Sequence, residues 1–181
     1  MFVPKTCGFT GHRPQAFLGK LINTLNDIPI KFFEEIRKML LDMYHNHDCR
    51  KFITGGAVGF DQWVALVLIE LKKEFPDIVT VMAKPFPSQD CKWPPQVREE
   101  FKQLCSQIDE IVEVSPDPYH PSKMHIRNQW MVDHSDIYIA CIYPETKWGG
   151  TYSCLQYAIK KKLPIYILDP GTGKYYAYES S

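Results

Sequence analysis

The stretch that decides the fold is residues 51–61, which read KFITGGAVGFD. Phe52, Ile53 and Thr54 are typical of a buried strand, and two glycines follow them directly. Apolar residues then recur at 64, 67, 68 and 71, the spacing of one helix face. A strand, a glycine turn and a helix in this order predict a βα unit, because glycine allows the sharp turn between the two elements.

The same alternation extends along the rest of the chain. Strands are predicted at 5–10, 51–54, 78–83, 110–114, 137–142 and 165–168, and helices near 32–43, 64–71, 95–105, 124–134 and 151–162. Successive βαβ units with right-handed crossovers predict an α/β protein with a three-layer, Rossmann-like, doubly wound and mainly parallel sheet. At 181 residues we expect one domain over 5–170 and a C-terminal tail over 171–181, whose tyrosines either dock on the body or do not.

Composition restricts the classes of partner. Twenty-one Lys and Arg balance 21 Asp and Glu, whereas proteins that bind nucleic acid through bulk phosphate contacts carry a basic excess. We therefore expect no nucleic-acid partner of that kind, although a local basic patch is compatible with this balance. No apolar run approaches the roughly 18 residues of a membrane span, and residues 1–5 lack a signal-peptide pattern. We expect a cytoplasmic protein with no membrane partner.

Cysteine and histidine spacing favours no metal or redox site. The six cysteines include no CxxC pair, which excludes zinc-knuckle and thioredoxin-type spacing. His45, His47 and Cys49 lie close in sequence, but at a position where a polar helix end is expected. We predict no metal and no cofactor.

Three loops that follow predicted strands bring glycines and polar side chains to one edge of the sheet. In open α/β sheets the ligand crevice lies beyond the carboxyl ends of the strands, and a helix that starts after a glycine turn presents free N–H groups to an anion. Arginine at such a position pairs with phosphate through its planar guanidinium. The predicted ligand-binding residues are Gly11, His12, Arg13, Gly55, Gly56, Asp61, Arg127, Gly149, Gly150 and Thr151.

Each of these residues also has a structural interpretation. The glycines can serve only as tight turns, and Arg13 can form a salt bridge at the rim. Asp61 can stabilise the first turn of its helix instead of contacting a ribose hydroxyl. Arg127 can point into the crevice or cover apolar surface.

Two common nucleotide motifs are absent from the sequence. Residues 55–59 lack the GxGxxG spacing of a dinucleotide fold, and no GxxxxGK[ST] phosphate loop occurs. This disfavours a standard NAD dehydrogenase and a P-loop ATPase.

Segments 8–14, 53–61 and 127–136, together with Gly150 and Thr151, resemble the SLOG superfamily, and most closely its YpsA-like branch. This Rossmann-like group includes the lonely-guy cytokinin-activating enzymes and the DNA-processing protein A fold. The resemblance implies glycine loops that bind nucleotides or nucleotide-derived ligands, often in a homodimer. Lonely-guy phosphoribohydrolases carry a catalytic Glu two residues after the loop Thr, whereas here Thr151 is followed by Tyr152 and Ser153.

The expected function is therefore binding of a small phosphorylated ligand, a nucleotide or an ADP-ribose-like molecule, by a sensing or regulatory module. The alternative is a hydrolase or transferase acting on a nucleotide N-glycosidic bond, which needs a carboxylate. Asp61, Glu145 and Asp133 are the nearby carboxylates, and none is assigned as catalytic.

Overall fold

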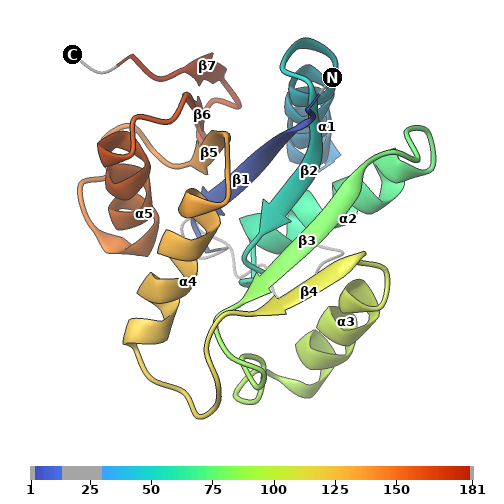
Figure 1. The fold of residues 1–181 in the computed structure, drawn as a ribbon, viewed down its shortest axis with the longest axis vertical. Coiled ribbons are helices and arrows are strands. Elements are labelled where there is room, and N and C mark those ends of the chain that lie inside the picture. The colour runs from blue at the N-terminus through green and yellow to red at the C-terminus, as the bar shows by residue number, and fades with distance from the viewer. Residues whose placement is uncertain (1–2, 14–29, 180–181) are drawn as a thin grey trace.

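The fold is built on a sheet of seven strands (Figure 1). The computed structural model describes residues 3–13 and 30–179. The strands are β1 (Lys5–Gly11), β2 (Cys49–Thr54), β3 (Val79–Lys84), β4 (Glu110–Glu113), β5 (Ile137–Cys141), β6 (Ile165–Leu168) and β7 (Tyr175–Ala177). Their spatial order is β4-β3-β2-β1-β5-β6-β7, and all neighbours are parallel except β6 and β7. This confirms the predicted mainly parallel α/β sheet.

In the described residues, five helices cover the two faces of the sheet. They are α1 (Ile30–Asn46), α2 (Phe60–Lys72), α3 (Pro95–Cys105), α4 (Ser122–Asp133) and α5 (Gly149–Lys160). Strand β5 is buried on both sides, because Ile139 packs in the cluster with α1 and α2 while Ala140 packs in the cluster with α4 and α5. Helix α3 packs beside α2, through Phe101 and Leu104. The result is the predicted three-layer arrangement, with α4 and α5 in front of the sheet in Figure 1.

The described part of the predicted tail is not free. Residues 175–177 form β7, an antiparallel edge strand in which Tyr176 pairs with Ile167. On the other side of this strand, the Tyr175 hydroxyl donates to Asp42 Oδ2 at 3.1 Å, and its ring stacks on Tyr166 with centroids 5.4 Å apart. The tail therefore extends the sheet, and one of its tyrosines fastens it to α1.

Glycines in β1 make room for side chains of the neighbouring elements. A Cβ at Gly8 would lie closer than 3.0 Å to Ser135 Oγ and to the Tyr138 ring. A Cβ at Gly11 would collide with the ring of Phe60, the first residue of α2. The start of α2 is thereby seated directly against the carboxyl end of β1.

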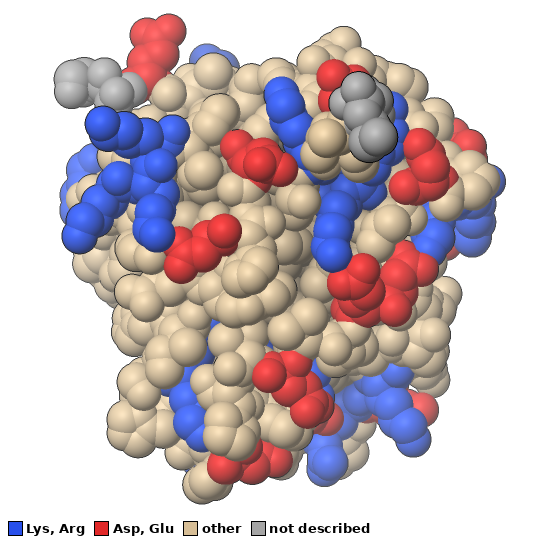
Figure 2. Space-filling model, in the orientation of Figure 1, with Lys and Arg blue, Asp and Glu red and all other residues tan. Residues whose placement is uncertain are grey.

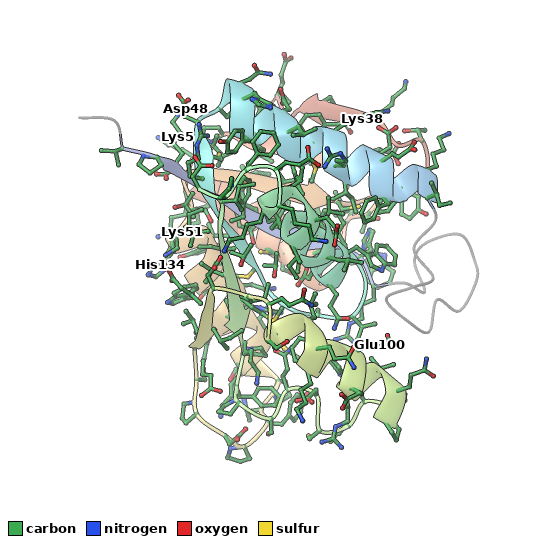
Figure 3. The ribbon with its side chains drawn as sticks, turned by 90° about the vertical axis from the view of Figure 1, so that its right-hand side faces the viewer. Lys5, Lys38, Asp48, Lys51, Glu100 and His134 are labelled. Carbon is green, nitrogen blue, oxygen red and sulfur yellow. The ribbon has the colours of Figure 1, made fainter. Side chains whose placement is uncertain are left out.

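The order of the strands places a crevice at the ends of β1 and β5. The chain runs from β1 outward to β4 on one side and from β5 to β7 on the other, so the order reverses between β1 and β5. Gly11 pairs with Cys141, and the His12 N–H donates to the Cys141 carbonyl at 3.2 Å. Ligands of open α/β sheets bind at such a switch point. Figure 3 shows Lys5, Asp48 and Lys51 at the other end of the strands, where β1 and β2 begin.

Candidate functional site

A pocket of about 570 Å³ lies at this switch point, between β1, the start of α2, α4 and the loop that leads from β5 into α5. Every predicted site residue except Gly55 and Gly56 lines it. The lining residues are Thr10, Gly11, His12, Arg13, Ala57, Asp61, Met124, Arg127, Asn128, Tyr143, Thr146, Trp148, Gly149, Gly150 and Thr151.

Arg127 is the buried cation of the pocket, and only 6% of its surface is exposed. Its Nη1 donates to the carbonyl of Gly55 and, at 3.2 Å, to the carbonyl of Ala83, while Nε donates to Asn128 Oδ1 at 2.9 Å. Arg127 therefore joins α4 to the ends of β2 and β3 and does not cover apolar surface. Its Nη2 donates to no described residue, which leaves two N–H donors for a ligand.

Asp61 is the buried carboxylate of the pocket and is also 6% exposed. It lies in the first turn of α2, whose N-cap is Gly59, and its Oδ2 accepts from the Ala57 N–H at 3.4 Å. Burial raises the pKa of Asp61 to about 6, against the opposing effects of the Arg127 charge, the Ala57 N–H and the Arg13 charge. This carboxyl consequently changes its charge near neutral pH.

Gly55 and Gly56, which the sequence predicts as ligand-binding residues, are not among the residues that line the pocket, so their ligand-binding role stays a prediction. A Cβ at Gly55 would lie within 3.0 Å of both Arg127 Nη1 and Asp61 Oδ2, so this glycine makes room for the two charged groups. Gly56 has a φ of +67°, and its carbonyl accepts from Gln62 Nε2 and Gln89 Nε2, each at 3.1 Å. Both glycines shape the loop that supports the charged pair and do not border the pocket.

The start of α5 is open on its pocket side. Gly149 has a φ of +90°, and a Cβ at Gly149 or Gly150 would meet no atom within 4 Å. The first turn of α5 contains no acidic residue, and its N-cap, Trp148, makes no side-chain capping bond. Helix starts carry partial positive charge and unpaired N–H groups, so this end offers space and charge to an anion.

His12 and Tyr143 form an aromatic wall of the pocket. Their rings stack with centroids 5.8 Å apart, and the Tyr143 N–H donates to His12 Nε2 at 3.4 Å. Burial lowers the pKa of His12, against the opposing charge of Glu145. A neutral ring at pH 7 is what an accepting Nε2 requires. His12 thus holds the loop after β5 in place.

Arg13 is exposed at the pocket mouth. It forms no ion pair with any residue of 3–13 or 30–179, so the rim salt bridge considered above has no partner there. Its charge contributes to lowering the pKa of Asp61, which places it within electrostatic reach of the buried carboxyl.

Sequence reasoning missed the aromatic part of the site. Tyr143 and Trp148 line the pocket, and Trp148 is 81% exposed. Both lie in the loop between β5 and α5, and the position of Trp148 directly before the paired glycines was the available signal. Asn128 was also missed, although it directly follows Arg127 and accepts a hydrogen bond from it.

Other predicted features lie away from the pocket. His47 Nε2 lies 3.1 Å from the Tyr166 hydroxyl, and within the described ranges no group of three or more His, Cys, Asp or Glu residues is placed to hold a metal. Asp133 binds Lys161 at 2.7 Å on the outer surface, and Glu145 is not among the lining residues. Among the residues that the structure describes, no helix has the length and apolar character to cross a membrane.

Comparison with known proteins assigns the family. The YspA SLOG family matches residues 7–170. The chain belongs to this family. Among its relatives is the uncharacterized SPbeta prophage-derived protein YoqJ of Bacillus subtilis (strain 168), 32% identical over 149 residues, covering 76% of this chain and 86% of the relative. A UPF0398 protein of Levilactobacillus brevis is 32% identical over 140 residues, covering 75% and 74%.

Solved structures confirm the fold of this SLOG family member. DNA processing protein A from Helicobacter pylori, described by its single-stranded DNA binding mode, superposes with a TM-score of 0.59 at 17% identity. DNA processing protein A from Streptococcus pneumoniae superposes with a TM-score of 0.57 at 10% identity. Both matches cover 92% of this chain, but only 66% and 50% of the respective neighbours. The family assignment and the fold both agree with the resemblance drawn from the sequence.

The buried Asp61 predicts a specific pH dependence of stability. Because folding raises the pKa of Asp61 from 3.8 to about 6, its contribution is fully present below pH 3.8 and is lost as the pH rises through 6. In urea unfolding, the stability of wild type relative to Asp61→Asn should fall by about 2.4 kcal/mol between pH 4 and pH 7. Parallel curves for the two proteins across this range would contradict the assignment.

Proposed function

We propose that this protein binds a nucleotide or a nucleotide-derived phosphorylated ligand, including ADP-ribose-like molecules, as a sensing or regulatory module. The observation that carries the proposal is the pocket at the switch point, where an open helix start, a buried Arg–Asp pair and an aromatic wall face one space. A phosphate, a hydroxyl-bearing sugar and a planar base are the three chemical parts that such a pocket suits.

The phosphate is assigned to the start of α5. Gly149 and Gly150 leave room for close backbone approach there, and the Thr151 hydroxyl lines the same space. Arg13 stands at the mouth of the pocket and can reach an anion as a charged donor. Backbone N–H groups with a nearby guanidinium form a usual phosphate cradle.

The sugar and base are assigned to the remaining walls. Asp61 accepts hydrogen bonds when ionised, which suits ribose hydroxyls, and Arg127, whose Nη2 donates to no described residue, lines the same pocket. Tyr143 and the exposed Trp148 offer flat aromatic surface for a base. A homodimer, as the resemblance implies, and a cytoplasmic location remain predictions, the first measurable by light scattering.

Nucleic acid needs separate consideration. On the face shown in Figure 2, acidic and basic side chains are interspersed, with a basic cluster at the upper left. The net charge of zero also argues against bulk phosphate-backbone contacts. The fold neighbour from Helicobacter pylori is nevertheless described by single-stranded DNA binding, so balanced charge alone does not exclude that partner. Short oligonucleotides therefore belong in the ligand panel.

Replacing Arg13 tests the phosphate site. Arg13→Ala should weaken the binding of nucleoside mono- and diphosphates about tenfold to hundredfold, since a hydrogen bond to a charged group contributes about 1.5–3 kcal/mol. Thermal stability should barely change, because Arg13 is exposed. Titration calorimetry measures the binding, with Arg98→Ala on α3 as the matched control. Equal affinities for wild type and Arg13→Ala would make this site assignment wrong.

Replacing Gly150 tests whether a ligand phosphate lies against the backbone at the start of α5, and the substitution leaves the fold undisturbed. A Cβ at Gly150 meets open space, so Gly150→Ala should keep or raise stability by up to about 1 kcal/mol. The same methyl group would occupy the proposed phosphate position and should weaken ligand binding by at least about tenfold. Ser153→Ala, on the same helix but outside this pocket, is the control. Unchanged affinity in Gly150→Ala would move the phosphate away from α5.

A second function, cleavage or transfer at a nucleotide N-glycosidic bond, is favoured by one observation. Asp61 is a buried pocket carboxyl whose pKa is raised to about 6, a value suited to proton transfer near neutral pH. Thr151, however, is followed by Tyr152 and Ser153 and not by a carboxylate. We expect chromatography to detect no free base released from nucleoside 5′-monophosphates. Turnover that disappears in Asp61→Asn would establish the enzyme function instead.

A further inference from the structure

A second pocket adjoins the candidate site on the far side of the loop between β5 and α5. It has a volume of about 400 Å³ and lies between this loop, α5 and the strands β6 and β7. Tyr143 and Thr146 line both pockets, so the loop is a shared wall. We call it the tyrosine pocket, and its lining residues are Ile142, Tyr143, Pro144, Thr146, Lys147, Tyr152, Leu155, Gln156, Ile167, Tyr176, Ala177, Tyr178 and Glu179.

The lining of the tyrosine pocket is aromatic and nearly neutral. Four tyrosines surround it, and its two charged residues, Lys147 and Glu179, are of opposite sign. Its aromatic character depends on β7: Tyr175 is held by Asp42 on one side of this strand, and the next residue, Tyr176, lines the pocket and is 41% exposed. This chemistry suits a flat uncharged ring and offers no concentration of positive charge for a phosphate.

We propose that the tyrosine pocket binds a second nucleobase, and that the ligand of this protein carries two bases joined through phosphate. The inference rests on the proposed function, which assigns the phosphate to the start of α5. Its own support is continuity, because the residues that separate the two pockets, Tyr143 and Thr146, belong to both. Each pocket lies within or near the usual range of small-ligand sites, so each has room for one base.

The experiment compares a one-base nucleotide with two-base compounds that differ in the linkage between their bases. The affinities of 5′-AMP, diadenosine 5′,5′-diphosphate and 5′-phosphorylated ApA are compared by titration calorimetry on the full chain. The last two compounds share two bases and differ in a pyrophosphate or a phosphodiester linkage. Stacking on aromatic side chains tolerates any base, so adenine serves as a general probe.

We expect at least one two-base compound to bind wild type about 5- to 150-fold more tightly than 5′-AMP, the range that one additional stacked base provides. Tyr176→Ala should remove this advantage and leave the affinity for 5′-AMP unchanged. Tyr176→Phe keeps the ring and should keep the advantage. Tyr119→Ala, at a tyrosine that is 48% exposed and lines neither pocket, should behave as wild type.

Two results overturn this inference while leaving the proposed function intact. One is binding of 5′-AMP with no advantage for either two-base compound. The other is an advantage that survives in Tyr176→Ala. If none of the three compounds binds wild type, both the inference and the proposed function are wrong. Thermal melts of the Tyr176 variants establish that each is folded before its affinities are compared.

Discussion

The site at the carboxyl ends of the strands depends on how the buried guanidinium of Arg127 is hydrogen-bonded. A buried charge is costly unless it is paired and hydrogen-bonded, and Arg127 is bonded to the Gly55 and Ala83 carbonyls beside the carboxyl of Asp61. Leaving a buried donor or acceptor of such a set unsatisfied typically costs about 1–3 kcal/mol, and more for a charged group. Position 55 suits glycine because a Cβ there would displace the guanidinium of Arg127 and the carboxyl of Asp61.

The two charged groups also come from opposite faces of the molecule. Asp61 comes from α2 and Arg127 from α4, helices that pack on opposite faces of the sheet. Side chains from opposite layers can meet only beyond the ends of the strands, where the sheet no longer separates them. The switch point between β1 and β5 supplies that opening, and Gly11 allows the start of α2 to lie close to it. The same geometry therefore creates the crevice and places opposite charges within it.

The regular elements could be predicted from sequence because they have periodicity. Helix α3 was predicted at 95–105 and strand β6 at 165–168, and both have those bounds in the structure. Strand β7 was missed because three residues are too few to show an alternating pattern, and its pairing with β6 provides what the local sequence lacks.

The site was predicted less completely, since glycine serves more than one purpose. The glycine motifs lie at the edge of the sheet where the pocket is found, but Gly55 and Gly11 make room for neighbouring protein atoms, whereas Gly149 and Gly150 face open space. A sequence cannot distinguish these cases, because a missing side chain looks the same whether a helix or an empty pocket lies next to it. The aromatic wall at Tyr143 was missed because loops have no periodicity.

The two helix starts at the pocket are not equivalent, and the difference gives the proposed ligand a direction. The positive end of α2 already holds the carboxyl of Asp61 in its first turn. The start of α5 has no acidic residue and no capping side chain. An anion beside Asp61 would meet a like charge above pH 6, whereas an anion at α5 would meet unpaired N–H groups. The start of α5 is therefore the better place in the pocket for an anion, and the surroundings of Asp61 on α2 are the better place for hydroxyl groups.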